Sequence, residues 1–404
     1  MQKFIFHSYS VNNTYNSNSK IDSRNFEFKS AGEVSEDLYL TYTSHIPTGL
    51  FALENKYGME VCITNVGGRI VSILVPDKNG LMRDVVLGFD TLKGYIDYEQ
   101  RHSNSHGALV GRFANRIQDG VFSLDGKTYK LPQNNGSNCL HGGFYGWAFQ
   151  TFEVVKHNKN VLHLKLKSPD GDMGFPGNVD FSVLYRLDDD NSLHVSYEAT
   201  TDKPTPINVT NHAYFNLSGD HSKTVLGDKL FINSRFMTPL NDKTCPNGDI
   251  VRIKKRGPFD FYFGNMFGSK AFCDGKQIGE DINAADEQIA MGHGYDHNFI
   301  LQDKKKTKRA RLPFYEDLPI CARLSNENSG IALEVYTSEP GVQFYDSVDL
   351  DGKLVGKNNI PLKSNSGACL ETQHFPDGPN KDHFPSTILR PGEKFRSKTI
   401  YKFS

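Results

Sequence analysis

The chain has no apolar run that approaches the roughly 18 residues needed for a membrane-spanning helix. Near its start the longest apolar stretch is Phe4–Phe6, which is too short for the hydrophobic core of a secretory signal. These two absences make a cytoplasmic location the default expectation, and they give no reason to expect contact with a membrane.

Cysteine is scarce, with six residues among 404 and no CxxC pair. In a chain of this size, such scattered thiols argue against both a disulfide framework and a zinc ribbon. We therefore expect free thiols in a reducing compartment at Cys62, Cys139, Cys245, Cys273, Cys321 and Cys369.

An excess of charge of either sign is also missing, because 46 basic residues nearly balance 47 acidic ones. A balanced chain has no overall field that attracts nucleic acid or an anionic lipid surface. The composition thus favours a neutral small molecule as the partner and gives no indication of nucleic-acid binding.

Residues 1–45 differ from the remainder of the chain. Asparagine and serine are dense through Ser8–Ser23, and no hydrophobic periodicity is present. This composition is typical of a poorly ordered leader. We expect one β-sandwich domain over residues 46–404.

Alternation of apolar and polar residues dominates this second part. Val179–Leu187 and Leu193–Ala199 alternate on either side of an Asp-rich turn, which predicts a hairpin with one buried face. Asp125-Gly126 predicts a type I′ turn in a second hairpin. Amphipathic helices are few, with short helical turns expected near Thr91–Tyr98 and Glu287–Met291. Many strands with few helices indicate an all-β fold, a large antiparallel β-sandwich.

A basic stretch contains six lysine and arginine residues between positions 304 and 311. Such a run can bind nucleic acid or serve as a targeting signal. Given the balanced charge of the whole chain, we interpret it as a solvated hairpin tip.

Four segments concentrate polar residues that packing does not require. They are Gly111–Ile117, Asn138–Gly143, Asn208–Leu217 and Cys369–Asp377. Each residue also has a structural explanation: His141 can cap a loop, and His212 can be a hydrogen-bonded core histidine. Glu371 is the most suggestive single residue, because a carboxylate next to the apolar run Ala368–Leu370 needs partners or its pKa rises. Such surroundings produce general bases.

Together these segments resemble the galactose mutarotase (aldose 1-epimerase) family. The shared motifs occur in the order of the family and span roughly residues 46 to 404. They read GRFANRI, NCLHGG, NVTNHAYFNL, GYDHNFIL, EPGVQFY and ACLETQHFPDGPN. The resemblance implies the supersandwich fold of that family, activity on free aldohexoses such as galactose and glucose, no cofactor, no metal, and a monomer or weak homodimer. The leader and the basic stretch depart from the pattern but touch none of the motifs.

The resemblance also implies roles for seven residues. Glu371 would be the general base and His212 the general acid of a ring-opening reaction. Asn115 and Arg116 would bind sugar hydroxyls, and His141 would lie beside C1 and the ring oxygen. Asp296 would accept hydrogen bonds from two neighbouring hydroxyls, and Gln343 would lie near Glu371. The residue types agree with the two catalytic roles, because a histidine titrates near working pH and a carboxylate with an apolar flank stays basic.

Four other interpretations remain open from the sequence. A glycoside hydrolase could use Asp296 and Glu371 as a carboxylate pair. An epimerase of hexose 6-phosphates would need a cationic phosphate pocket, and a non-catalytic sugar-binding module would have lost the acid or the base. His293, Asp296 and His297 have metal-ligand side chains, but residues with this spacing share one face only when they lie on a helix. The glycines around them indicate a loop instead.

Overall fold

The structure is a computed structural model that describes residues 46–98, 105–262, 275–309 and 312–404. The expected leader lies outside these residues, and so does Cys273. The other five cysteines are buried and free, as the sequence predicted. In the described part of the chain, no helix is long and apolar enough to cross a bilayer.

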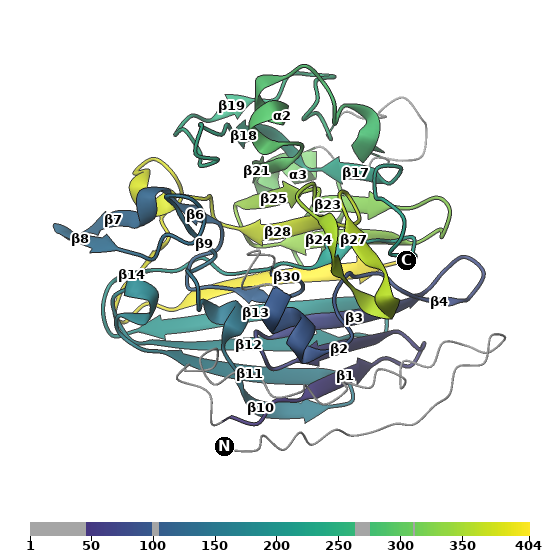
Figure 1. Cartoon of the computed structure of the whole chain (residues 1–404), viewed down its shortest axis with the longest axis horizontal. Coiled ribbons are helices and arrows are strands. Elements are labelled where there is room, and N and C mark those ends of the chain that lie inside the picture. The colour runs from purple at the N-terminus through teal and green to yellow at the C-terminus, as the bar shows by residue number, and fades with distance from the viewer. Residues whose placement is uncertain (1–45, 99–104, 263–274, 310–311) are drawn as a thin grey trace.

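The largest element is a ten-stranded antiparallel sheet (Figure 1). Its central strand, β30, joins β13 on one side to β24 on the other. Along one path the order is β10 (Glu153–Asn158), β11 (Val161–Ser168), β12 (Val179–Leu187), β13 (Ser192–Thr201), β30 (Phe395–Phe403), β24 (Ala332–Thr337), β23 (Leu318–Ser325), β17 (Lys229–Ile232) and β20 (Lys276–Gln277), with β22 (Phe314–Tyr315) paired to β23.

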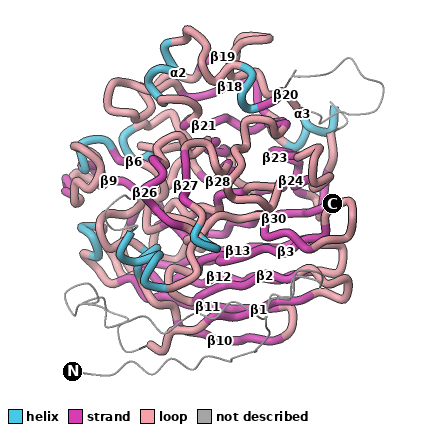
Figure 2. The backbone as a smooth tube through the Cα atoms, turned by 45° about the vertical axis from the view of Figure 1, so that its right-hand side comes forward, coloured by secondary structure: helices cyan, strands magenta, loops and turns pink. Residues whose placement is uncertain are grey.

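Two smaller sheets pack against this one. A four-stranded sheet runs in the order β1 (Leu50–Glu54), β2 (Glu60–Thr64), β3 (Arg69–Pro76) and β4 (Met82–Asp84). A six-stranded sheet runs in the order β16 (Tyr214–Phe215), β28 (Ala368–Gln373), β25 (Gly341–Tyr345), β21 (Asp296–Leu301), β18 (Ser234–Thr238) and β19 (Val251–Arg252). Figure 2 shows β1 to β3 lying over the β10–β13 half of the large sheet.

One continuous apolar cluster fills the space between the layers. It includes Leu164 and Val183 from the large sheet, Ile73 from the four-stranded sheet, and Phe344 and Leu370 from the six-stranded sheet. The burial of β12 alternates along its whole length, as the period-two pattern predicted. The expected all-β antiparallel sandwich is therefore confirmed.

Short two-stranded ladders connect the sheets and hold the loops around one end of the molecule. They pair β5 (Leu109–Val110) with β15 (Thr210–Asn211), β6 (Arg116–Ile117) with β9 (Cys139–Leu140), β7 (Val121–Leu124) with β8 (Lys127–Lys130), β14 (Thr205–Pro206) with β29 (Ile388–Leu389), and β26 (Asp351–Val355) with β27 (Pro361–Lys363). The predicted turn between β7 and β8 is confirmed, because Asp125 and Gly126 have φ values of 49° and 78°.

The helices are short. The predicted turn at Glu287–Met291 is α2 (Glu287–Gly292), which begins where Asp286 accepts hydrogen bonds from the backbone N–H groups of Gln288 and Ile289. The turn expected near Thr91–Tyr98 includes a π-helical segment, η3 (Gly94–Tyr98).

The prediction that the basic stretch forms a hairpin tip was wrong, because the stretch is helical. Lys304–Arg309 form the short helix α3, in which Lys304, Lys305, Lys306 and Lys308 are exposed. Asp303 accepts a hydrogen bond from the backbone N–H of Lys306 at 2.8 Å and so supports the first turn. Positions 310 and 311 lie outside the described residues.

Candidate active site

Three adjacent strands of the six-stranded sheet present polar side chains on one face. Gln343 on β25 pairs with Glu371 on β28 and with Asn298 on β21. Asp296 lies two residues before Asn298, so its side chain points to the same face. These strands are therefore a rigid support for Asp296, Gln343 and Glu371.

Loops and short ladders bring the other four predicted residues to this face. Arg116 begins β6, and the pairing of Arg116 with Leu140 places His141, just after β9, beside Asn115. The backbone N–H of Asn115 donates to Nδ1 of His141 at 3.2 Å. His212 lies between β15 and β16, so all seven residues predicted from the resemblance converge on one region.

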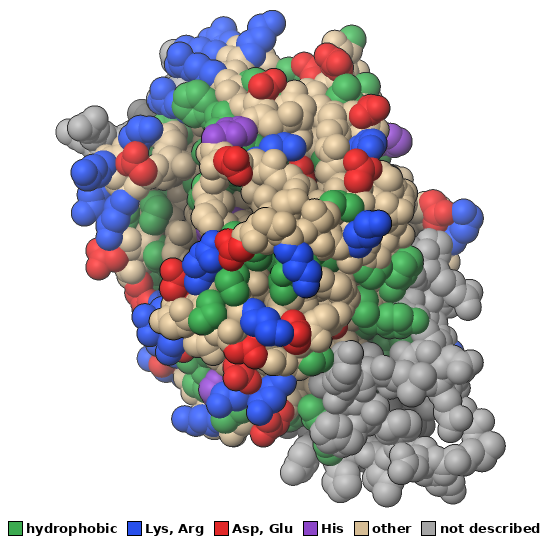
Figure 3. All heavy atoms as spheres, turned by 90° about the vertical axis from the view of Figure 1, so that its left-hand side faces the viewer, with side chains coloured by type: hydrophobic (Ala, Val, Ile, Leu, Met, Phe, Trp, Pro, Cys, Tyr) green, Lys and Arg blue, Asp and Glu red, His purple; other side chains and the backbone are tan. Residues whose placement is uncertain are grey.

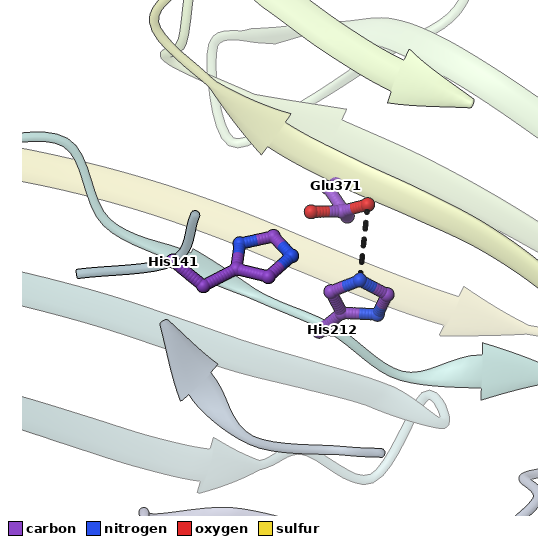
Figure 4. A group of neighbouring side chains, drawn as sticks. All are labelled: His141, His212 and Glu371. Atoms are coloured by element: carbon purple, nitrogen blue, oxygen red, sulfur yellow. Dashed lines mark ion pairs between the residues drawn. The ribbon is translucent and has the colours of Figure 1, made fainter. Parts of the chain in front are cut away.

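His212 and Glu371 face each other at the centre of this region (Figure 4). Nε2 of His212 lies 3.4 Å from Oε1 of Glu371, and the two side chains are only 5% and 2% exposed. Burial raises the pKa of Glu371 well above its ordinary value, Asp296 raises it further, and Arg116 opposes both. Burial also lowers the pKa of His212, to about 3. Both shifts have the same physical origin, since a buried site disfavours the charged form of either group.

His141 lies against the same pair. Its ring centroid is 5.2 Å from that of His212 in an edge-on contact, and Figure 4 shows its ring directed toward His212 and Glu371. Burial holds the pKa of His141 well below its usual range, and the neighbouring His212 and Arg116 act in the same direction. His141 is therefore a neutral hydrogen-bonding group at working pH.

Arg116, Asp296 and Gln343 form a second group beside the pair. Nη1 of Arg116 lies 3.1 Å from Oδ2 of Asp296, and Nε2 of Gln343 donates to the other oxygen at 2.7 Å. Burial raises the pKa of Asp296, but Arg116 and the hydrogen bond from Gln343 outweigh it and bring the pKa below the ordinary value. Asp296 is thus an ionised acceptor, while Glu371 is a carboxyl whose proton affinity is high.

Several buried polar atoms at this site have no hydrogen-bond partner within the described residues. They are Oε2 of Glu371, Oε1 of Gln343 and Nδ1 of His212. Buried polar groups in folded proteins are normally hydrogen-bonded, so a cluster of unpaired ones needs an explanation. A ligand rich in hydroxyl groups, or water in its place, supplies both the donors and the acceptors that these atoms require.

The geometry can also accommodate a metal ion. One ligand atom each from His141, His212 and Glu371 lies within 4.8 Å of the others, and two histidines with a carboxylate are a ligand set that Zn²⁺ uses. His293, considered above as a possible ligand, instead follows α2 in a left-handed conformation. Nδ1 of His297 accepts a hydrogen bond from the backbone N–H of Asp296.

Two aromatic residues that the sequence did not single out complete the surroundings of His212. The ring of Tyr214 stacks on His212 at 4.9 Å, and Tyr345 approaches it edge-on at 6.4 Å. Tyr214 follows His212 by two residues in the NHAYFN motif, and this spacing was a usable signal. Tyr345 ends the EPGVQFY motif, two residues after Gln343, but its approach to His212 depends on the pairing of β25 with β28.

The chain is similar in sequence and in fold to known proteins. The galactose mutarotase of Bos taurus is 38% identical over 348 residues, which cover 86% of this chain and 91% of that protein. The aldose 1-epimerase of Escherichia coli is 34% identical over 359 residues, covering 88% and 95%. A solved aldose epimerase homologue from C. elegans superposes with a TM-score of 0.76 at 31% identity, covering 88% of this chain and 99% of the other. The family model described as Aldose 1-epimerase matches residues 49–402. The chain therefore belongs to the aldose 1-epimerase family of carbohydrate isomerases.

Proposed function

We propose that this protein interconverts the α and β anomers of free aldohexoses, with galactose and glucose both accepted, by acid–base opening and closing of the sugar ring. The observation that carries the proposal is the buried pair of Glu371 and His212, whose nearest atoms lie 3.4 Å apart. Anomer exchange requires one base and one proton donor around a single acetal carbon, and this pair supplies both.

In the opening step, Glu371 takes the proton of the C1 hydroxyl while His212 gives a proton to the ring oxygen. The bond between C1 and the ring oxygen breaks, and C1 becomes a carbonyl carbon. Rotation about C1–C2 then exposes the other carbonyl face. In the closing step His212 takes back the proton of the hydroxyl, Glu371 returns its own, and the opposite anomer forms.

The burial of the pair influences this cycle. Before opening, Glu371 is a carboxylate and His212 an imidazolium; after opening, both are neutral. Burial raises the pKa of Glu371 and lowers that of His212, so it favours the neutral pair that ring opening produces. His212 has lost one proton and Glu371 has gained one, so the net charge of the site does not change.

The remaining residues suit the binding of a hydroxylated ring. Asp296 is a charged acceptor held by Arg116, and hydrogen bonds from two adjacent sugar hydroxyls would fit its two oxygens. The carbonyl oxygen of Gln343 has no partner among the residues that the structure describes, and neutral His141 can stabilise the charge that develops near C1. Figure 3 shows acidic and basic side chains interspersed over the face that it displays, which agrees with a neutral substrate.

Polarimetry of freshly dissolved α-D-glucose and α-D-galactose tests the proposal. We expect the wild-type protein to accelerate the approach to anomeric equilibrium, and Glu371→Gln and His212→Asn to remain near the spontaneous rate. An assay in the presence of a chelator separates acid–base chemistry from a role for a metal at His141, His212 and Glu371. A folded wild-type protein without acceleration would reject the proposal, and glucose 6-phosphate and nitrophenyl glycosides would be assayed next.

A further inference from the structure

A buried histidine outside the predicted site lies behind His212. The ring of His106 stacks on Tyr214 with a centroid distance of 4.2 Å and an interplanar angle of 19°. Tyr214 in turn stacks on His212 at 4.9 Å and 20°. The three rings therefore form a column with Tyr214 in the middle, and its far end is 0% exposed at His106.

The backbone ties the two ends of this column together. The N–H of Gly107, the residue after His106, donates to the carbonyl oxygen of His212 at 2.8 Å. The side-chain amide of Asn211 donates to the carbonyl oxygen of Gly107 at 2.8 Å. Gly107 has a φ of 67°, and a Cβ there would lie 2.1 Å from the carbonyl oxygen of Ile70, so glycine is required for this close approach.

A buried guanidinium fixes the segment from its other side. Nη1 of Arg69 donates to the carbonyl oxygen of His106 at 3.0 Å, and Nη2 donates to that of Ala148 at 2.8 Å. Phe89 packs edge-on against the His106 ring at 5.3 Å. His106 is thus held on several sides and is a rigid end to the column.

His212 lacks the usual means of fixing a catalytic imidazole. In most such sites, the ring nitrogen that does not react is hydrogen-bonded to a carboxylate or a carbonyl group, which sets the ring plane. Nδ1 of His212 is buried and has no partner within the described residues, whereas Nε2 faces Glu371. Tyr214 stacks parallel to the His212 ring, whereas His141 and Tyr345 meet that ring edge-on.

We propose that His106 is a positioning residue for the reaction: it fixes the plane of the His212 imidazole through the ring of Tyr214. The proposal rests on the proposed function, since it assigns His106 a part in the same acid–base chemistry. His106 acts on the sugar only through His212.

Three variants test the stacked column. His106→Phe keeps a flat ring in the column, and His106→Ala removes it. His163→Phe is the matched control, since His163 is a half-buried histidine on β11 of the large sheet. We expect His106→Ala to lower kcat by about 10-fold to 100-fold with KM changed by less than about 2-fold, as a shifted catalytic group predicts.

His106→Phe should keep most of kcat, because a flat ring still ends the column behind Tyr214. The control should match the wild type in kcat and in KM.

A second measurement does not depend on activity. In the Glu371→Gln background, the NMR signals of the His212 ring protons should shift with His106→Ala and stay near their original position with His106→Phe; the signals are assigned by their loss in His212→Asn. Unchanged signals or unchanged kcat in His106→Ala would overturn the proposal. So would a rise in KM at constant kcat, because it would make His106 a binding residue. An inactive wild type would instead reject the proposed function, and the ring signals would still decide the effect of His106 on His212.

Discussion

The ten-stranded and six-stranded sheets use the same strand geometry for different purposes. In β12 of the large sheet, buried apolar residues alternate with residues that are half-buried or exposed. In β28 of the small sheet, all six residues are buried, and Glu371 and Gln373 are among them. Strand β12 thus has one buried face, which is apolar, whereas β28 has two buried faces and presents polar groups on one of them.

This difference has an energetic consequence. Burial of polar groups without partners costs free energy, and Glu371, Gln343 and His212 all retain unpaired buried atoms within the described part of the chain. The apolar cluster between the layers offsets that cost. Rigid strands hold the site in a geometry that is favourable for chemistry and unfavourable for stability.

The largest effect should come from the carboxylate of the small sheet. Glu371→Gln should lower the anomerisation rate by about 100-fold to 10,000-fold, because the amide cannot take a proton. Its thermal unfolding should be unchanged or shifted upward, since a buried group with a raised pKa is replaced by a neutral one. The matched control is Glu334→Gln on β24 of the large sheet, where Glu334 accepts a hydrogen bond from Tyr336. Equal losses of rate in both variants would contradict the conclusion that the six-stranded sheet carries the chemistry and the ten-stranded sheet does not.

The opposite pattern should follow from a core change in the large sheet. Leu164→Ala on β11 removes a side chain that is 0% exposed, and it should lower the free energy of unfolding by about 2–5 kcal/mol. The rate per folded molecule should stay within about 2-fold of the wild type, because β11 contributes nothing to the site. Chemical denaturation and polarimetry on the same samples measure the two quantities. A large loss of rate in fully folded Leu164→Ala would show that the two sheets are coupled.

A smaller effect should follow from the acceptor beside the catalytic pair. Asp296→Asn removes the charged partner of Arg116 and weakens the contact with Gln343. We expect kcat/KM to fall by roughly 10-fold to 100-fold, in proportion to the loss of one or two hydrogen bonds to a charged group. Asp180→Asn, an exposed position on β12, is the control and should behave as the wild type does. The inference that Asp296 binds substrate would be rejected if kcat/KM did not change.

The smallest effect concerns stability and pH at the edge of the large sheet. Burial raises the pKa of Asp228, just before β17, to about 7. An unfolded aspartate ionises near pH 4, so the stability that protonated Asp228 contributes is present below about pH 4 and is lost as the pH rises through about 7.

Asp228→Asn should therefore be more stable than the wild type at pH 8 and nearly equal to it at pH 4. Its anomerase activity should not change, because Asp228 contacts Asn326 and none of the seven site residues. Denaturation at the two pH values measures the difference. A variant less stable at pH 8 would mean that ionised Asp228 is needed in the folded state.

The parts of the fold that the sequence predicted correctly are those where local signals decide. The hairpin of β12 and β13 follows from alternation, and the β7–β8 turn follows from the preference of Asp-Gly for positive φ. Helix α3 was missed, although Asp303 before a run of lysines is a cap followed by good helix formers. The helix propensity of this lysine-rich stretch, and not its charge, is the signal that predicts α3.

The site was harder to predict from the residues alone. No local pattern shows that His212 and Glu371 meet, because this depends on how β28 pairs with β25 and how the β15–β16 segment crosses them. The resemblance to a family supplied that information. It assigned no role to His106 or Tyr214, which stack with His212 in one column.

The position of β30 also bears on how the molecule assembles during synthesis. This strand follows all the other described strands in the chain, yet it lies between β13 and β24 at the centre of the large sheet. A nascent chain that has not yet released β30 from the ribosome can pair β10 to β13 with one another and β17 with β23 and β24, but it cannot join these two groups. The halves of the sheet must remain with open edges until β30 has been synthesised, and exposed strand edges invite aggregation. Cells that make this protein should thus depend on chaperones most strongly before β30 leaves the ribosome.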